Sequence, residues 1–427
     1  MANLSRLEDR ADLQISIVLL ASWAAIAISS NWGHWPPDLS ALFLAGHFWA
    51  AGQYDLVYAA PEGFFGPGVQ SWADEIARLG HEGETFFPFV YPPLWAALAA
   101  PLAERLGPSG FFNSFFVAHI LMIAVSIMLT YRLIRPPVPM VLWCVISCAL
   151  LFTSLIASSA LFHNQLQITV TFLIILALER YKSGASITAG IALGLAAAIK
   201  ITPVALGLIF LLDRDHRAVA ATALTGLTLL ALSLAIAGPD LHAQFLTSVR
   251  DISGQIALMH VNWNIEAYLF QIKTLITGPP LHSLPLIPNM ALAEPLWTRI
   301  ATIAICIAGL AFVLTRTQHL SPEDRLRLRP FGLLLVLTLC APLGWSHHYL
   351  PILLLLPSIL TIRPPIRAIA LIMIFACLTS LPVFSLIKPL STHIHMQAML
   401  PITVLLATFA LFFARPQTSA TDASASR

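Results

Sequence analysis

Residues 35–54 read WPPDLSALFLAGHFWAAGQY and follow a long apolar run over residues 13–30. The two prolines disfavour continuation of the first helix, and Asp38 stands at the start of the next one. Residues 41–51 are apolar on every side and rich in aromatic rings, as is typical of a helix lying half in lipid at a membrane surface. We therefore expect a first membrane span to end here and to leave one carboxylate, Asp38, at the interface.

Two interpretations of Asp38 are open from the sequence. Aspartate commonly caps a helix by accepting hydrogen bonds from its first backbone N–H groups. Such a cap keeps the carboxylate ionised, and an ionised carboxylate is also what a general base must be at neutral pH. The sequence therefore allows a structural role, a catalytic role or both.

The composition indicates an all-α polytopic membrane protein. Of 427 residues, 58% are hydrophobic and only 10% are charged, and the mean hydropathy is +0.80. A net charge of +2 without a basic run among aromatics gives no reason to expect nucleic acid as a partner. The sequence has no HExxH or CxxC pattern and no Gly-rich phosphate loop, so we expect no metal and no cofactor.

Apolar runs of spanning or nearly spanning length predict a single transmembrane domain over residues 1–415. We expect about twelve membrane helices, at 13–30, 110–132, 138–158, 164–181, 186–200, 203–213, 217–237, 297–315, 331–344, 346–361, 366–385 and 398–414. The run 92–104 is interrupted by Pro101 and is expected to lie at the outer surface or to be partly inserted.

The distribution of Lys and Arg predicts the orientation, because cytoplasmic segments carry an excess of them. It places both termini inside and two hydrophilic stretches outside, a first outer loop at 31–109 with interfacial helices and a second at 238–296. Within the first loop, residues 61–85 are rich in Gly and acids and are expected to be mobile. The tail 416–427 is rich in Ser, Thr and Ala, and we expect it to be a disordered cytoplasmic segment.

This orientation brings a set of polar and aromatic residues to one depth on the outer side. The set consists of Asp38, Tyr91, Gln165 within the His163–Gln167 segment, Lys200, Arg250, Asn262, Lys273, Trp345, His347 and His348. Adjacent residues point in different directions on a helix, so we expect one of the two histidines to face a cavity.

Some residues of this set could instead have purely structural roles. Lys200 precedes Pro203 between two short apolar runs, where it could face an anion or could extend its ammonium to the interface. Tyr91 and Trp345 could stack on a sugar ring or could belong to the interfacial aromatic belt.

Four motifs together resemble glycosyltransferase family 87, a family of GT-C membrane enzymes that includes polyprenyl-phosphate-mannose-dependent α-1,2-mannosyltransferases. They are Asp38 with its aromatic, Ala-rich helix to Tyr54; Phe89-x-Tyr91-Pro92-Pro93; Ala189, Gly190, Gly194, Lys200 and Pro203; and Pro342 with Trp345-Ser346-His347-His348-Tyr349. Their order and spacing cover roughly residues 30–360.

The resemblance implies a GT-C-like helix bundle and an inverting transfer of a sugar, mannose above all, on the outer (periplasmic) face of the inner (plasma) membrane. The implied partners are a polyprenyl-phosphate sugar donor, a lipid-linked or cell-envelope glycan acceptor and membrane lipids. Asp38 would be the general base. Lys200, Arg250, Lys273, His347 and His348 would bind the donor phosphate, and Tyr91, Gln165, Asn262 and Trp345 would bind sugar or acceptor.

Three alternatives stay open at this point. A GT-C enzyme could use a pentose donor such as arabinose. A polytopic lipid or sugar transporter would also need many spans and short broken helices, although the sequence has no evident inverted repeat. A non-catalytic membrane scaffold would leave the outer polar residues without a role.

Overall fold

The computed structural model describes residues 2–59, 69–278, 290–391 and 394–414, which form an all-α fold with one short β-ribbon. The α-helices up to the second outer loop are α1 (Ala2–Asn31), α2 (Leu39–Ala50), α3 (Gln70–Arg78), α4 (Pro93–Ile134), α5 (Met140–Thr153), α6 (Leu155–Phe162), α7 (Gln167–Lys182), α8 (Ser186–Ile199), α9 (Gly207–Leu212) and α10 (His216–Ser253). The remaining α-helices are α11 (Ile265–Thr277), α12 (Leu296–Thr317), α13 (Pro322–Leu339), α14 (Leu350–Leu355), α15 (Pro365–Leu378), α16 (Leu381–Leu386) and α17 (Met396–Phe413).

The short elements complete the fold. The ribbon pairs β1 (Gln255–Leu258) antiparallel with β2 (Met290–Ala293). Single 3-10 turns occur at η1 (Tyr54–Leu56), η2 (Thr202–Leu206), η4 (Ser346–Tyr349), η5 (Leu356–Thr361) and η6 (Lys388–Leu390). The predicted disordered tail, 416–427, lies outside the described residues, as does the part of the predicted mobile loop before residue 69.

Five helices in the described part of the chain are long and apolar enough to cross a membrane: α1 from Asp9 onward, α4, α10, α12 and α17. Helices α6 and α7 together make a sixth candidate that is bent by 119°. The expected count of about twelve spans is therefore not confirmed. Several apolar runs fold as shorter helices because polar or proline breaks divide them, at Ser154, at Lys200–Pro203 and at Pro351 and Pro357.

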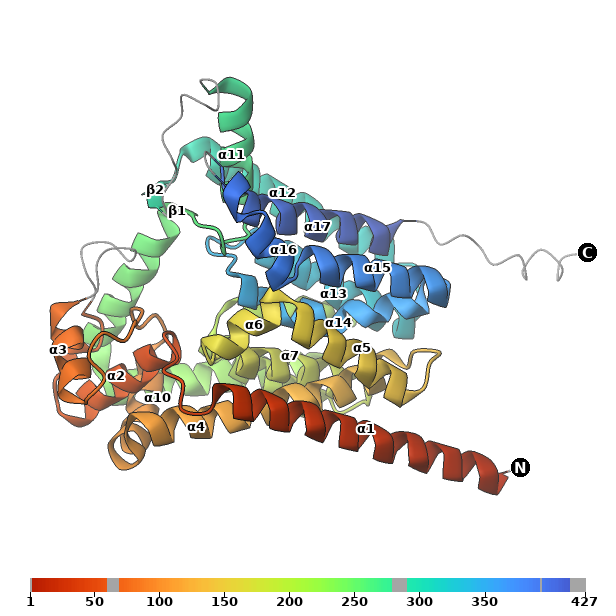
Figure 1. The fold of residues 1–427 in the computed structure, drawn as a ribbon, viewed down its shortest axis with the longest axis horizontal. Helices are drawn as coiled ribbons and strands as arrows, with labels where there is room; N and C mark the ends of the chain where they lie inside the picture. The colour runs from red at the N-terminus through yellow and green to blue at the C-terminus, as the bar shows by residue number, and fades with distance from the viewer. Residues whose placement is uncertain (1, 60–68, 279–289, 392–393, 415–427) are drawn as a thin grey trace, which may run out of the picture.

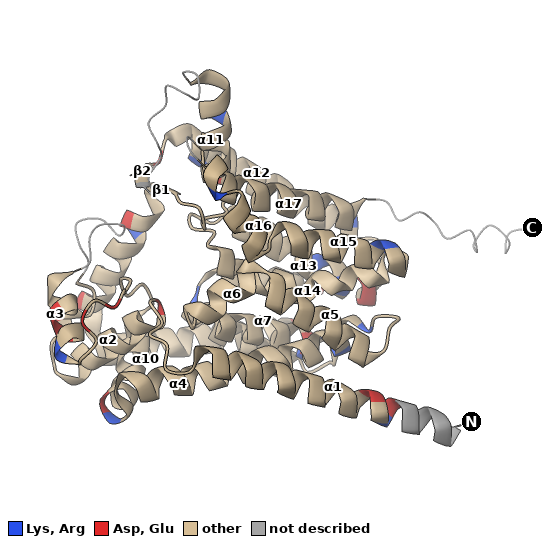
Figure 2. Ribbon diagram, viewed as in Figure 1, with Lys and Arg blue, Asp and Glu red and all other residues tan. Residues whose placement is uncertain are grey.

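The long helices run side by side, with the start of α1 and the end of α17 at one end of the molecule (Figure 1). Helix α3 and the β1–β2 ribbon lie at the opposite end (Figure 1). Figure 2 shows that Lys, Arg, Asp and Glu are few along the helices and that most of the ribbon belongs to other residues. This arrangement fits a membrane protein with its two hydrophilic loop regions on one side.

The described part of the first region contains a helix that the sequence did not predict. The prediction of a mobile loop over 61–85 is wrong for residues 70–78, which form helix α3. Trp72 and Ile76, one helical turn apart, are buried, and the indole of Trp72 lies against Phe48. His47 and Glu75 add a 2.6 Å contact between α2 and α3. Burial of an apolar stripe thus stabilises a short helix that composition alone did not reveal.

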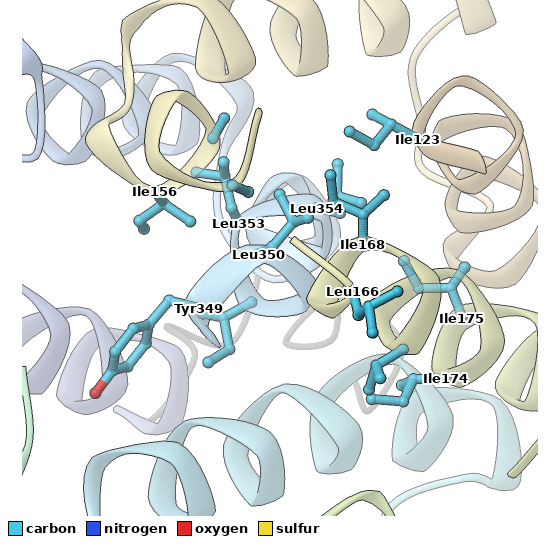
Figure 3. Packing of buried hydrophobic residues seen from close by; sticks show 14 of the residues in the cluster. Ile123, Ile156, Leu166, Ile168, Ile174, Ile175, Tyr349, Leu350, Leu353 and Leu354 are labelled. Atoms are coloured by element: carbon cyan, nitrogen blue, oxygen red, sulfur yellow. The ribbon is translucent and has the colours of Figure 1, made fainter. Parts of the chain in front are cut away.

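A fully buried helix, α14, stands at the centre of the bundle. Leu350, Leu353 and Leu354 of α14 pack among Ile156 of α6 and Ile168 of α7 (Figure 3). Since η4 leads directly into α14, this packing fixes the position of the two histidines in η4.

Helix α8 packs closely on α10 through its small residues Gly190 and Gly194. A Cβ atom at Gly190 would lie 2.4 Å from the carbonyl oxygen of Ala218, and one at Gly194 would lie 2.7 Å from Cβ of Thr225. Only glycine allows this approach, which holds α8 against the first turns of α10.

The substitution Gly190→Ala is expected to destabilise the fold by about 1–3 kcal/mol, because the added methyl group must push two backbones apart. Thermal unfolding of the detergent-solubilised protein measures this effect. Gly226→Ala is the matched control, since a Cβ atom there has nothing within 4 Å. Equal unfolding temperatures for the two variants would contradict the close packing of α8 on α10.

Candidate active site

Asp38 begins the site, and its side chain points into the protein instead of capping α2. It occupies the N-cap position with φ −85° and ψ −41°, but it accepts no hydrogen bond from the first turn of the helix. Its Oδ2 accepts a 2.8 Å hydrogen bond from Nε2 of Gln165. Of the two interpretations of Asp38, the capping one is therefore wrong, because the carboxylate bonds instead to the distant α6–α7 turn.

Gln165 is itself fixed by a tyrosine. Its Oε1 accepts a 3.0 Å hydrogen bond from the hydroxyl of Tyr91, which leaves the amide N–H groups facing Asp38. The backbone carbonyl of Tyr91 accepts from the hydroxyl of Tyr58. The chain Tyr58–Tyr91–Gln165–Asp38 thus joins the two ends of the first outer region to the bent helix pair. Tyr58 was not among the residues predicted from the sequence.

Burial shifts the pKa values of Asp38 and Tyr91. It raises the pKa of the Asp38 carboxyl above its ordinary value, while the nearby His163, the Gln165 amide and the Lys200 ammonium oppose the rise by favouring the ionised form. Burial also raises the pKa of Tyr91, and the charge of Asp38 adds to the effect, so Tyr91 stays neutral. The side chain of Asp38 is still 20% exposed, which lets a ligand hydroxyl reach it.

Lys200 lies on the other side of the same cluster. Its Nζ donates to Oε1 of Gln167 at 3.0 Å and to Nε2 of His348 at 2.9 Å. His348 can accept there because its Nδ1 donates to the carbonyl of Leu343 at 3.1 Å. An ammonium that extends to the interface would not have these inward partners, so the sequence interpretation of Lys200 as a snorkelling residue is wrong. Gln167 ends the His163–Gln167 segment of the predicted polar set, but only Gln165 of that segment was predicted to bind a ligand.

The two adjacent histidines of η4 face different neighbours. Their rings stand at 84° to each other, and His348 turns to Lys200 whereas His347 lies 6.3 Å from His163, centroid to centroid. His347 is 5% exposed, and its Nε2 has no hydrogen-bond partner among the described residues. Nδ1 of His163 lies 3.5 Å from the Asp38 carboxylate. The histidines therefore complete a cluster that extends from Asp38 to Lys200.

Four predicted site residues lie elsewhere or are already engaged. Asn262 is fully buried, donates to the carbonyl of Ala257 and accepts from the backbone N–H of Gly344, so it holds the turn that carries Trp345. Trp345 is half-buried and is bridged to Asn262 through the backbone. Arg250 is exposed near the end of α10, and the exposed Lys273 lies with its ammonium 5.0 Å from the centre of the Trp297 ring.

An apolar groove opens at this cluster. It has a volume of about 1170 Å³, and its walls come from the start of α4, the segment from the end of α8 to α9, and α10. Tyr91 and Lys200 line the groove and also belong to the polar cluster. Several wall residues are exposed to the surroundings: Leu211, Leu227, Leu230 and Leu246. In a membrane, such a groove is open to lipid.

The profile of glycosyltransferase family 87 matches residues 89–342, more than half of the chain. The chain belongs to glycosyltransferase family 87. This family 87 enzyme is therefore a transferase of sugars, which requires a sugar donor and an acceptor. Comparison with curated proteins finds no match.

The matched range contains Tyr91, Gln165 and Lys200 but neither Asp38 nor the two histidines. The fold of the family 87 enzyme brings both outlying segments to the matched core, through the Gln165–Asp38 and Lys200–His348 hydrogen bonds. The cluster is thus the candidate active site, and it is assembled from segments inside and outside the matched range.

Proposed function

We propose that this enzyme transfers a sugar, preferentially mannose, from a polyprenyl-phosphate donor to a hydroxyl of a lipid-linked or cell-envelope glycan, in the manner of a GT-C enzyme. The observation that carries the proposal is the apolar groove that shares Tyr91 and Lys200 with the cluster around Asp38. Its volume of about 1170 Å³ exceeds that of most small-molecule pockets, and its walls suit a long hydrocarbon chain.

Lys200 is the candidate for binding the donor phosphate. An ammonium has three N–H donors, and Gln167 and His348 accept two of them. The third can serve a phosphate oxygen at the point where the groove reaches the cluster. His347 is a second candidate, because its buried Nε2 is without a partner among the described residues. Arg250, next to the groove residue Val249, is a third and more distant one.

Asp38 is proposed as the general base of a single displacement with inversion. The acceptor hydroxyl oxygen attacks the anomeric carbon as its proton passes to the Asp38 carboxylate. The bond between that carbon and the phosphate oxygen breaks, and polyprenyl phosphate leaves with the electron pair. The departing polyprenyl phosphate is a phosphate monoester, which needs charge stabilisation more than a proton, and this suits a cation such as Lys200 on the donor side.

The two hydrophilic loop regions lie at the end of the molecule opposite the start of α1 (Figure 1). We place that end outside the inner (plasma) membrane, with both termini in the cytoplasm and the active site on the periplasmic face. The excess of Lys and Arg in the segments at the other end supports this orientation.

The acid limb of the kcat/KM–pH profile is expected above the ordinary Asp value of 3.8, because burial raises the pKa of Asp38. The base must be ionised, so activity is present above the pKa of Asp38 and is lost as the pH falls through it. The measurement is transfer at saturating acceptor over a pH series. An acid limb at or below the ordinary value would contradict Asp38 as the base.

The proposal is tested by incubating the purified enzyme with polyprenyl phosphates carrying labelled mannose, glucose or arabinose, together with membrane-extracted acceptors. We expect labelled mannose to leave its lipid and to appear in a glycosidic product. If label is transferred only from the arabinose donor, the donor sugar is a pentose and the proposal of mannose is wrong. If the label instead stays on the lipid and crosses a vesicle membrane, the protein moves the lipid-linked sugar and the proposed transfer reaction is wrong.

A further inference from the structure

The turn between α6 and α7 holds Asp38 at two points. Gln165 donates to the Asp38 side chain at 2.8 Å, and the carbonyl of His163 accepts from the backbone N–H of Leu39 at 3.3 Å. The position and the partner of the carboxylate therefore depend on the conformation of residues 163–165. Any group that fixes this turn also fixes the site.

This turn ends α6 with a left-handed residue that is not glycine. Asn164 has φ 47°, and its N–H bonds to the carbonyl of Leu161 at 3.0 Å, while the N–H of Gln165 bonds to that of Ala160 at 3.0 Å. These are the two hydrogen bonds of a Schellman motif, in which asparagine is the usual alternative to glycine. Because a non-glycine residue is strained there, surrounding contacts must hold it.

His119, on α4 and only 1% exposed, supplies such a contact. Its Nδ1 lies 2.7 Å from Oδ1 of Asn164, and its Nε2 lies 3.0 Å from Oγ1 of Thr169. The amide nitrogen of Asn164 donates to the carbonyl of Phe112, so Oδ1 faces His119 and accepts. A neutral His119 therefore carries its proton on Nδ1, and Nε2 accepts from the Thr169 hydroxyl.

We propose that His119 is a positioning residue, which acts through Asn164 to hold the α6–α7 turn so that Gln165 bonds to Asp38. His119 does not line the groove, and it reaches Asp38 through Asn164 and the turn. Its second partner, Thr169, lies on α7, the helix that follows the turn. A histidine that merely fills the core would need no directed bond to Asn164, a left-handed residue beside the site. Helix α4 thereby helps to hold the turn whose Gln165 bonds to the Asp38 carboxylate.

Loss of the His119 contact is expected to change both the rate of transfer and the pKa of Asp38. Without the bond from His119, Asn164 keeps an unsatisfied buried oxygen and the turn loses one of its constraints. Gln165 then stabilises the ionised carboxylate less, so the pKa of Asp38 rises further. The other groups facing Asp38 are His163 on the same turn, Tyr91 before α4 and Lys200 after α8; these remain in every variant compared below.

The test compares His119→Ala, His119→Asn and His119→Gln in the full-length enzyme. An asparagine amide can place an N–H near the position of Nδ1 and donate to Asn164, whereas the longer glutamine cannot place one there. We expect kcat to fall about 10- to 100-fold in His119→Ala and His119→Gln, with the donor KM within about threefold. The acid limb should shift to higher pH in both, and His119→Asn should restore both quantities.

A second readout needs no substrate. Infrared titration follows the carboxyl band of Asp38, assigned by its absence in Asp38→Asn, and should show a raised midpoint in His119→Ala and His119→Gln only. This part holds even if no donor is turned over, whereas the kinetic part rests on the proposed function. Ser126→Ala, which removes a buried hydroxyl on the same helix that bonds to Met122, is the control.

A double-mutant cycle with Asn164→Gly tests the route, since glycine adopts the left-handed conformation without help. The His119→Ala effect should be smaller in that background. The proposal is overturned if the midpoint and the acid limb stay unchanged in His119→Gln, or if His119→Asn is no better than His119→Gln.

Discussion

Asp38→Asn is expected to reduce sugar transfer by roughly 10²- to 10⁴-fold, the range that removal of a general base costs. The asparagine oxygen can still accept the hydrogen bond from Gln165, so the fold and the donor site should persist. The measurement is the transfer rate from the preferred labelled donor, with donor binding and the unfolding temperature recorded for the same preparation. The expected pattern is a loss of kcat with nearly unchanged donor affinity.

Asp55→Asn is the matched control for this variant. Asp55 is an exposed carboxylate of η1 in the same outer region, and its loss changes the net charge by the same amount. We expect transfer by this control within about twofold of the parent, as for most surface substitutions. Retained turnover in Asp38→Asn would remove Asp38 from the role of base.

Lys200→Ala is expected to weaken donor binding by about 10- to 100-fold, because a charge-assisted hydrogen bond contributes roughly 1.5–3 kcal/mol. The loss should appear mainly in the donor KM and in direct binding of polyprenyl phosphate, which lacks the sugar. The variant also removes a cation that favours the ionised form of Asp38, so its acid limb should move to higher pH.

Arg105→Ala serves as the control for Lys200→Ala. Arg105 is an exposed cation of α4, so its removal changes the net charge equally and leaves the groove intact. An unchanged donor affinity in Lys200→Ala, equal to that of this control, would show that the buried ammonium has only a structural role between Gln167 and His348.

Several residues of the candidate site could be predicted because the sequence places them at one depth in the membrane. Asp38, Gln165, Lys200 and His348 all stand where an apolar run is interrupted, and interruptions expected at one membrane depth can meet in space. The structure does bring these four together. Their pairing could not be predicted, since Gln165 and Asp38 are 127 positions apart and Lys200 and His348 are 148 apart.

Other roles had no signal in the sequence. Asn262 was predicted to bind sugar or acceptor, yet its amide donates to the carbonyl of Ala257 and accepts from the N–H of Gly344. His119 lies within a long apolar stretch, so nothing in its neighbourhood indicated a contact with the α6–α7 turn. The spacing of Trp72 and Ile76, one helical turn, did indicate helix α3. The surrounding Gly and acidic residues indicated a mobile loop instead, and the prediction followed them.

The number of spans was the least predictable property. Hydropathy measures the length of an apolar run but not whether the backbone continues as one helix through it. At Ser154 the chain turns extended, and the serine side chain caps α6. At Lys200 it also turns extended, and η2 begins at Thr202. The break at Lys200 provides one of the turns from which the candidate site is built.

The most direct test of the central claim is a cryo-EM structure of the Asp38→Asn variant with an intact polyprenyl-phosphate sugar. We predict the hydrocarbon chain in the groove between α4, α9 and α10, the phosphate against Lys200, and the anomeric carbon on the side facing residue 38. A donor bound outside this groove, or with its sugar turned away from residue 38, would contradict the account.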